Sequence, residues 1–390
     1  MSIEITIHKD LPLGTWLGLG GAITEATAYN FSKLSPTKQK QLLDAYYGKS
    51  GLDYHWGRIP IGACDFCLQP YEYTKRSDLS DFSIAHDEKW LLPMLRKVNK
   101  MKKLTFVAAP WSPPSCLKFL HMRRFGGRLK LWHYKTYAEY LHKWLNAYKN
   151  EGVTIDYLSP QNEPFARQIW ESCRYSFRAQ RKLASALSGL GPKLLLWDHN
   201  KKQLARVADE LLPGTDAGLC FHWYDGACPE QMWSVHQKYP NTLMVSSEMC
   251  CGFSPYDEKE WQKDAALYLK EIMTDINCGT RAWVDWNMLL NHNGGPSYCK
   301  NYVKSPVILN EAGNDFILTP IYKALKAFAK LFPVGSEIIR CDCDSEDIAV
   351  VARKTKNGYE TIVANLTDNN QTVVIGNREH TLAPFSVVKL

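Results

Sequence analysis

The sequence passes eight times from a short apolar run to a longer amphipathic segment, and this alternation constrains the fold more than any other feature. The apolar runs begin with WLGLGG at residues 16–21 and end with TRAWVDWNMLL at residues 280–290. The segments between them have helical spacing, as in 134–152, where apolar side chains recur every three or four residues. Strict alternation favours parallel strands covered by helices. Eight units over about 320 residues favour a closed (β/α)8 TIM barrel over an open sheet.

The two ends of the chain follow a different pattern. From about Gly335 onward, short β-branched runs are separated by turn residues, which predicts a small antiparallel β-sandwich. The alternating run IEITIH at residues 3–8 is suited to add one more strand to it. We therefore predict a barrel domain at residues 14–332 and a β-sandwich side module built from residues 1–13 and 333–390.

Composition excludes several classes of protein. The net charge of +7 is mild for 390 residues and no long Lys/Arg block occurs, so we expect no nucleic-acid partner. No window of 18 uninterrupted apolar residues occurs, and the N-terminus has no features of a secretory signal. We therefore expect no membrane span and a cytoplasmic location, where the twelve cysteines would be reduced thiols.

No motif calls for a metal or a cofactor. The CDFC motif from Cys64 to Cys67 has the spacing of a redox or zinc site, but the second CxxC of a four-cysteine zinc site is absent. The chain also lacks H-E-x-x-H, G-x-S-x-G and a G-x-G-x-x-G after the first predicted strand. We predict neither a metal nor a cofactor.

Polar and aromatic residues follow most of the predicted strands. In a (β/α)8 barrel the chemistry lies at the carboxyl ends of the strands. Two of the acids there, Glu163 and Glu248, follow the fourth and seventh strands and would face one another across the barrel mouth. The other residues at these ends are Arg58, Asp65, Trp111, Asn162, His222, Trp223, Tyr224, Ser246, Ser247, Asp285, Trp286 and Asn287.

Two carboxylates ringed by aromatic side chains fit glycoside hydrolysis, in which one acid protonates the leaving oxygen and the other attacks the anomeric carbon. The apolar neighbours of Glu163 in NEPF are expected to raise its pKa, so that it holds a proton near neutral pH. Structural roles remain open at this point. A single Glu after a strand is often a cap or an ion-pair partner, and His222 fits a packed core histidine equally well. Capping suits Asp198 and His199 at least as well as chemistry, and burial suits Trp16, Trp56 and Trp197.

Seven segments together resemble glycoside hydrolase family 30, most closely its glucosylceramidase-like (acid β-glucosidase) branch. The resemblance runs over residues 14–390, and it implies a retaining mechanism, in which a covalent glycosyl-enzyme intermediate forms. In chain order the segments are GLGGAITEATAYN, GRIPIGACDF, AAPWSPPSCLK, SPQNEP, FHWYD, SSEMC and WVDWNMLLNHNGGPSYCKN.

The resemblance also implies roles for single residues. Glu163 matches the general acid/base and Glu248 matches the nucleophile. Asn162 would bind the sugar 2-hydroxyl, while Tyr224 and Arg58 would lie beside the nucleophile. Four further positions match residues that hold the sugar in the −1 subsite: Asp65, Trp111, Trp286 and Asn301.

Specificity stays open among several readings. The first is a β-glucosidase; β-xylosidase, β-fucosidase and β-1,6-glucanase are alternatives within the family, and a non-catalytic sugar-binding barrel is an alternative outside it. Compact loops after the fifth to seventh strands argue against ceramide as the aglycone. We expect a small β-glycoside or an oligosaccharide as substrate, in a bacterial cell. The sequence does not indicate an oligomeric state.

Overall fold

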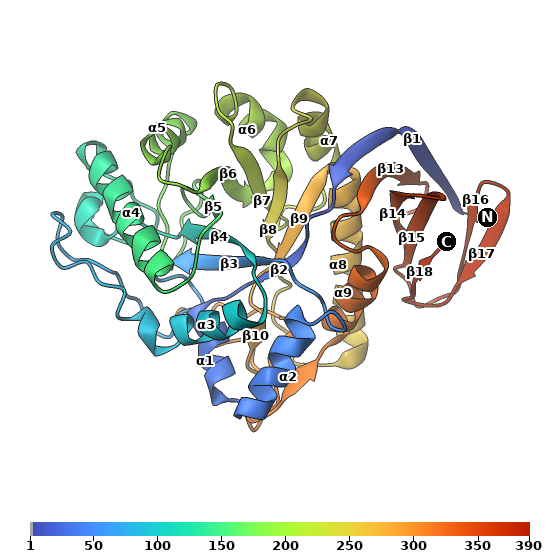
Figure 1. Cartoon of the computed structure of the whole chain (residues 1–390), viewed down its shortest axis with the longest axis horizontal. Coiled ribbons are helices and arrows are strands. Elements are labelled where there is room, and N and C mark those ends of the chain that lie inside the picture. The colour runs from blue at the N-terminus through green and yellow to red at the C-terminus, as the bar shows by residue number, and fades with distance from the viewer. Residues whose placement is uncertain (1–2) are drawn as a thin grey trace.

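The computed structural model describes residues 3–390, and its centre is a closed barrel of eight parallel strands (Figure 1). Each barrel strand pairs in parallel with the next along the chain, and β2 closes the ring against β9. The predicted (β/α)8 barrel is confirmed. Its strands are β2 (Gly18–Ala22), β3 (Trp56–Ile61), β4 (Thr105–Pro110), β5 (Tyr157–Leu158), β6 (Lys193–Asn200), β7 (Gly218–His222), β8 (Met244–Glu248) and β9 (Thr280–Asp285).

Helices follow the barrel strands where the alternation predicts them. Ser35 caps α2 by accepting a hydrogen bond from the amide of Lys38, with Pro36 as the first helical residue. Pro93 lies in the first turn of α3, where a missing amide hydrogen costs little. The helices are α1 (Glu25–Lys33), α2 (Pro36–Tyr47), α3 (Leu91–Met101), α4 (Tyr134–Asn150), α5 (Phe177–Leu187), α6 (Leu204–Leu211), α7 (Pro229–Lys238), α8 (Glu258–Asn277) and α9 (Pro320–Leu331). Short 3-10 turns are η1 (Asp87–Lys89), η2 (Ser115–Leu117), η3 (Phe119–His121), η4 (Leu131–His133) and η5 (Lys201–Gln203).

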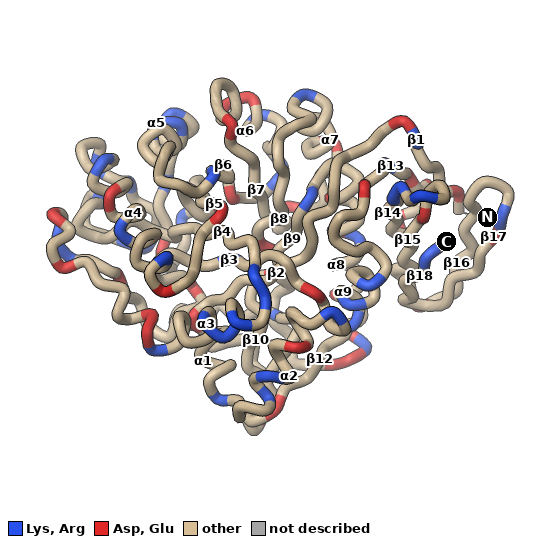
Figure 2. Tube along the Cα trace, in the orientation of Figure 1, with Lys and Arg blue, Asp and Glu red and all other residues tan. Residues whose placement is uncertain are grey.

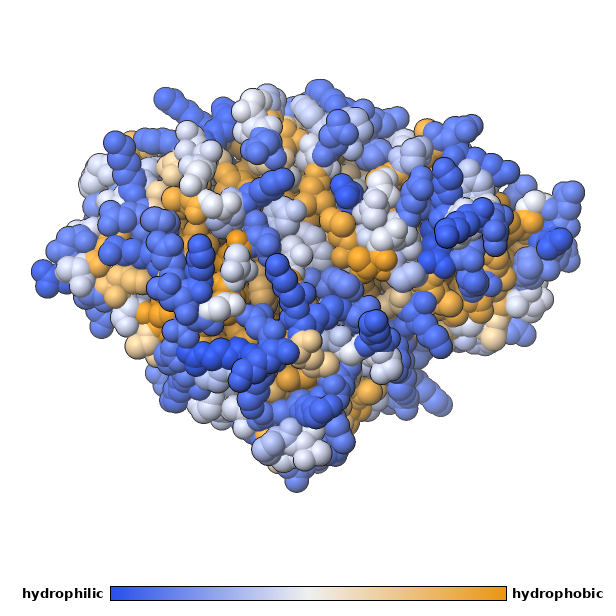
Figure 3. All heavy atoms as spheres, viewed as in Figure 1, coloured by the Kyte–Doolittle hydropathy of each residue, from blue (hydrophilic) through white to orange (hydrophobic). Residues whose placement is uncertain are grey.

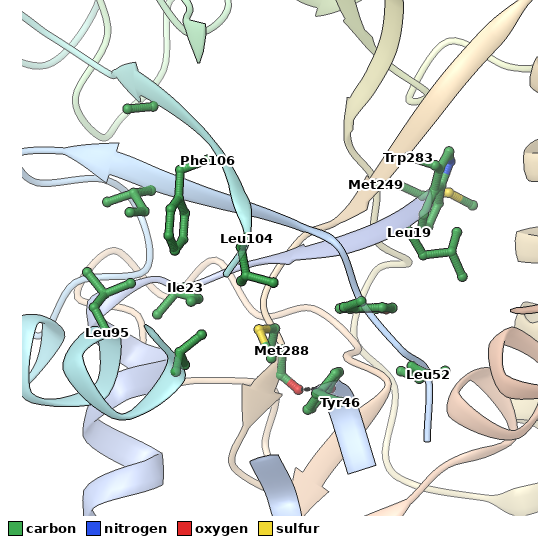
Figure 4. Close-up of a cluster of buried hydrophobic side chains, with 14 of the residues drawn as sticks. Leu19, Ile23, Tyr46, Leu52, Leu95, Leu104, Phe106, Met249, Trp283 and Met288 are labelled. Atoms are coloured by element: carbon green, nitrogen blue, oxygen red, sulfur yellow. Dashed lines mark hydrogen bonds between the residues drawn. The ribbon is translucent and has the colours of Figure 1, made fainter. Parts of the chain in front are cut away.

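Apolar side chains fill both the inside of the barrel and the layer under the helices. Figure 4 shows part of that layer, where the hydroxyl of Tyr46 in α2 donates a hydrogen bond to the carbonyl of Met288. The predicted apolar stripe of α4, including Trp144 and Tyr148, is buried in the same core. The barrel interior is a separate cluster of smaller side chains around Trp56. Its other members are Val107, Leu195, Cys220, Val245, Ala282 and Val284.

A seven-stranded sheet beside the barrel carries both ends of the chain (Figure 1). All of its pairings are antiparallel except that of β1 with β16, and β1 is the third strand of seven. The predicted antiparallel module, with a strand from the N-terminus, is confirmed. Its division from the barrel at residues 13 and 333 stays a prediction. Its strands are β1 (Ile3–Thr15), β13 (Glu337–Cys343), β14 (Ile348–Thr355), β15 (Gly358–Asn365), β16 (Gln371–Ile375), β17 (Arg378–Leu382) and β18 (Val387–Lys389).

Between β9 and α9 the chain forms a small sheet of three short strands, β10 (Leu289–Leu290), β11 (Val307–Leu309) and β12 (Phe316–Leu318). Basic and acidic residues are interspersed along most of the visible trace (Figure 2). Hydrophilic side chains cover most of the face drawn in Figure 3, with apolar ones between them. Among residues 3–390, no helix is long and apolar enough to cross a membrane.

Candidate active site

The site lies at the carboxyl end of the barrel, where parallel strands bring residues from distant parts of the chain together. Arg58 lies in β3, Asp198 in β6, His222 ends β7 and Glu248 ends β8. Four residues at the strand ends around the site have positive φ values: Glu163 at 48°, Trp197 at 82°, Asp198 at 50° and Asn287 at 68°. Non-glycine residues adopt this conformation only where the surroundings enforce it, and such strain is common at functional sites.

Arg58 is the centre of the polar network and its side chain is fully buried. Nη1 donates to Oε2 of Glu248 at 2.6 Å and to the carbonyl of Ser247 at 3.0 Å. Nη2 donates to Oδ1 of Asn162 at 2.7 Å and to Oδ2 of Asp198 at 3.0 Å. One rigid guanidinium therefore fixes four neighbours, and the paired acids compensate for the burial of its charge.

Of the two roles that the sequence left open for Asp198, capping and chemistry, its contacts fit a positioning role in the site. Besides Arg58, its carboxylate accepts from the hydroxyl of Ser247 at 2.6 Å and lies 3.1 Å from Nε2 of His222. Burial raises the pKa of Asp198, but Arg58 and His222 lower it more, so the carboxyl is ionised. An ionised carboxylate only accepts hydrogen bonds, so Nε2 of His222 carries a proton.

The other ring nitrogen of His222 faces both glutamates. Its Nδ1 lies 3.6 Å from Oε1 of Glu163 and 3.7 Å from Oε1 of Glu248. These two oxygens are therefore at most about 7.3 Å apart, a bound that admits the separation of about 5 Å typical of retaining enzymes and only the lower part of the range of about 6.5–9.5 Å typical of inverting ones. The structure thus brings the two acids to one place, as the sequence predicts.

The expectation that apolar neighbours hold a proton on Glu163 is wrong for the free protein. Burial raises the pKa of Glu163, but the imidazoles of His199 and His222, each 3.6 Å away, lower it below its usual range. Burial lowers the pKa of His222, while Glu248, Asp198 and Glu163 raise it to about 9. The proton near neutral pH therefore lies on Nδ1 of His222, next to Glu163.

Tyr224 lies beside Glu248, as the resemblance implies. Its hydroxyl donates to Oε1 of Glu248 at 3.0 Å, on the oxygen that Arg58 does not contact. The thiol of Cys250 is 3.3 Å from the same hydroxyl. Both oxygens of Glu248 are thus held, which fixes the direction in which the carboxylate points.

The four residues expected in the −1 subsite form two pairs. Asn301 donates to Oδ2 of Asp65 at 2.8 Å. Burial, together with the charge of Glu248, raises the pKa of Asp65 to about 8. The rings of Trp111 and Trp286 stack with centroids 5.2 Å apart, and the guanidinium of Arg58 lies 5.1 Å and 5.5 Å from them. Stacked indoles of this kind present flat apolar faces that suit a sugar ring.

The sequence placed Asp198, His199 and Ser247 at strand ends but did not indicate that they belong to the network. A signal for Asp198 was present, because a charged residue inside an apolar strand needs a buried partner. The sequence did not reveal the register shift in β6 between Trp197 and His199. This shift lets the side chain of Asp198 point toward the centre of the barrel mouth. Among residues 3–390, no cluster of three or more His, Cys, Asp or Glu could hold a metal ion.

Comparisons with known proteins agree with this geometry. The profile of the Glycosyl hydrolase family 30 TIM-barrel domain matches residues 17–332. The lysosomal acid glucosylceramidase of Mus musculus is 30% identical over 423 residues, covering 98% of this chain and 79% of that protein. The endo-1,6-beta-D-glucanase of Neurospora crassa is 24% identical over 407 residues, covering 96% and 82%. The crystal structure of SrfJ from Salmonella typhimurium superposes with a TM-score of 0.89 at 25% identity, covering 100% and 91%.

Proposed function

Because the chain belongs to glycosyl hydrolase family 30 and is a glycoside hydrolase, we propose that it is a retaining β-glucosidase of the glucosylceramidase-like branch. The observation that carries the proposal is the placement of Glu163 and Glu248 within 3.7 Å of the same nitrogen, Nδ1 of His222. Their separation suits a double displacement, in which one acid attacks and the other first protonates and later deprotonates.

In the first step Glu248 attacks the anomeric carbon. Arg58 and Tyr224 hold one oxygen each, so the carboxylate is oriented before the substrate arrives. Glu163 delivers a proton to the leaving oxygen, and we propose that this proton comes from Nδ1 of His222, which lies 3.6 Å away. Substrate binding would drive the proton from His222 to Glu163. A bound sugar excludes water from the site, and without water the neutral carboxyl of Glu163 is favoured over its charged form.

In the second step Glu163 acts as the base. It takes a proton from water, and that water attacks the glycosyl-enzyme bond from the side the aglycone has left. Asn162 is held by Arg58 and presents its amide to the sugar 2-hydroxyl. Asp65, Asn301 and the two stacked indoles bind the remaining sugar surface.

The identity of the sugar and of the linkage that is cleaved is also a proposal. A β-glucoside is favoured by the relatives named glucosylceramidase, of which the mouse protein is one. A β-1,6-glucan is the second candidate, because a relative of similar coverage is named an endo-1,6-beta-D-glucanase. β-Xylosidase and β-fucosidase activities stay alternatives from the sequence.

A panel of aryl β-glycosides and β-1,6-linked glucose oligomers tests the proposal. We expect turnover of the aryl β-glucoside with the β-anomer as first product in a proton NMR time course. The α-anomer as first product would contradict retention, and binding without turnover of any substrate would favour a sugar-binding protein.

We also propose a cytoplasmic location in a bacterium. Its support is the set of cysteines: all twelve are free thiols, and eight of them are buried. Even Cys64 and Cys67 keep their sulfurs 3.9 Å apart. Unpaired thiols in this number are typical of a reducing compartment.

A further inference from the structure

A second histidine, His199, faces the proposed acid/base. Its Nδ1 lies 3.6 Å from Oε1 of Glu163, the oxygen that is also 3.6 Å from Nδ1 of His222. The side chain of His222 is fully buried and is held by Asp198, whereas that of His199 is 17% exposed. The storage of one proton next to Glu163 requires only His222. The second imidazole against the same oxygen therefore indicates a further role.

The backbone at the end of β6 places His199 beside Glu163. Successive side chains of a regular strand point to opposite faces, but the register of β6 against β7 shifts between Trp197 and His199. Trp197 and Asp198 adopt positive φ values there, a conformation that costs energy in non-glycine residues. The amide of Glu163 donates to the carbonyl of Asp198 at 2.9 Å, which ties the segment after β5 to the end of β6. The irregular strand end thus lets both of its polar side chains reach the site.

Aromatic side chains hold the ring of His199 in place. Its centroid lies 5.2 Å from that of Trp197 and 6.5 Å from that of Phe165, and these two rings pack edge-on with centroids 5.0 Å apart. Nδ1 of His199 is buried and has no hydrogen-bond partner within residues 3–390, so Glu163 is the polar group that it faces. Because an ionised carboxylate only accepts hydrogen bonds, Nδ1 carries a proton. Catalytic contacts of this kind are often long in the free enzyme and shorten when substrate binds.

Transfer of the stored proton from His222 to Glu163 leaves a competing acceptor behind. Nε2 of His222 keeps its proton on Asp198, so Nδ1 carries a lone pair once its own proton has moved to Glu163. The new hydroxyl of Glu163 would then donate back to Nδ1 and point away from the glycosidic oxygen. A general acid must lie within hydrogen-bond reach of the atom that it protonates. His222 alone would therefore hold the proton of Glu163 in an unproductive position.

We propose that His199 turns the protonated carboxyl of Glu163 toward the leaving oxygen. Its Nδ1–H donates to the carboxyl oxygen that faces the two imidazoles, so this oxygen stays unprotonated and the proton lies on the other one. In the second step the same hydrogen bond holds the carboxylate while the outer oxygen takes a proton from water. His199 neither gains nor loses a proton in the cycle and is a positioning residue. The proposal rests on the proposed glycosidase function, since it deepens the role of Glu163.

The leaving group of the substrate separates this role from a merely structural one. In H199A we expect kcat/KM to fall roughly 10–100-fold with an alkyl β-glucoside, which needs the proton, and less than about threefold with a dinitrophenyl β-glucoside, which does not. The matched control is H236A. His236 on α7 also stacks on a tryptophan, Trp233, with centroids 5.5 Å apart, and its loss should leave kcat/KM for both substrates unchanged.

Two amide variants test whether the hydrogen bond from Nδ1 is the feature that matters. H199N keeps an amide nitrogen near the position of Nδ1 and should stay within about threefold of the wild type with both substrates. H199Q has its amide nitrogen near the position of Nε2 instead and should show the same dependence on the leaving group as H199A. Because both side chains are polar and similar in size, their comparison stands even if H199A fails to fold.

A double-mutant cycle shows whether His199 acts through Glu163. In the E163A background, H199A should change kcat/KM for the alkyl β-glucoside by less than about twofold, because the carboxyl that His199 positions is absent. Equal losses with both substrates in H199A, wild-type rates in H199Q, or the full effect of H199A in the E163A background would each overturn the role of His199 and leave the proposed function standing. Absence of any glycosidase activity in the wild type would instead overturn the proposed function, and this role with it.

Discussion

Nδ1 of His222 lies 3.6 Å from Oε1 of Glu163, while Nε2 of the same ring is held by Asp198 at 3.1 Å. A fixed imidazole between a buried aspartate and a catalytic acid can store one proton without moving. The burial and charge around this ring lead to predictions on activity, on pH dependence and on stability.

Replacing the proposed nucleophile should abolish turnover but leave the site open to a small anion. We expect Glu248→Ala to lose at least roughly 10⁴-fold in kcat, because no other group forms the covalent intermediate. Azide should restore activity and give an α-glycosyl azide, which mass spectrometry and NMR identify. Near wild-type turnover of Glu248→Ala would refute the assignment, and the exposed Glu230→Ala serves as the control.

The rate loss in a variant of the proposed acid/base, Glu163, should depend on the leaving group of the substrate. In Glu163→Ala we expect roughly 10³-fold or greater loss with an alkyl β-glucoside, which needs protonation, and a far smaller loss in the first step with a dinitrophenyl β-glucoside. Rapid-quench kinetics should show a burst of dinitrophenol followed by slow breakdown of the intermediate. Equal losses for both substrates would show that Glu163 does not protonate the leaving oxygen.

Asp198→Asn should change the pH profile as well as the rate. The charge of Asp198 helps to raise the pKa of His222, so its removal should lower that pKa and move the alkaline limb of kcat/KM to lower pH. We expect roughly a 10²-fold loss at the optimum, because Arg58 and His222 lose a shared anchor. The surface variant Asp209→Asn should keep both the rate and the profile. A lower rate with an unmoved alkaline limb would indicate a merely structural role.

The free energy of unfolding should decrease as the pH rises above about 6.5, because His222 loses its proton there. Its pKa is about 9 in the folded protein against about 6.5 in the unfolded chain. The stabilisation is therefore complete below pH 6.5 and is lost as the pH rises through about 9. It amounts to at most about 3 kcal/mol in the free energy of unfolding. Asp65, with a pKa of about 8, contributes in the same direction. Urea unfolding of the wild type and of His222→Gln across this range checks the slope, which should be shallower in the variant.

A buried ion cluster away from the chemistry gives a purely structural prediction. Lys201 is fully buried and donates to Glu271 at 2.8 Å and to Asp275 at 2.7 Å. Lys201→Met would leave two carboxyls facing one another without a cation, and we expect a loss of about 3–5 kcal/mol in the free energy of unfolding. Its exposed neighbour gives the matched control, since Lys202→Met should change stability by less than about 0.5 kcal/mol. Equal urea midpoints for the two variants would contradict the prediction.

The barrel helices and the side sheet could be predicted from the sequence because their signals are local. Ser35 before Pro36, the apolar spacing of 137–148 and the turn residues after 343 each act over a few residues. By contrast, α1 was missed. Its buried face is mostly alanine and polar side chains, and Thr24 rather than a stronger cap begins it. The β10–β12 sheet was missed as well, because strands of two or three residues carry no periodicity.

The sequence predicted most of the residues that form the site, but it did not predict their pKa values. Residues at strand ends come together in any barrel, so Glu163, Glu248 and Arg58 could be placed from the chain order alone. The pKa of Glu163 depends on two imidazoles within 3.6 Å, and such distances follow from tertiary packing. The same limit applies to Asp198, whose direction depends on a register shift in β6.

The position of β1 between β16 and β13 has a consequence for biosynthesis. β1 finds both of its neighbours, β13 and β16, only after the barrel between them has been translated. Until then its amides and carbonyls have no partner strand and are open to other nascent chains. The sheet that joins the two ends of the chain is therefore the last part of the fold to form, and a C-terminal truncation at α9 would leave β1 without either of its neighbouring strands.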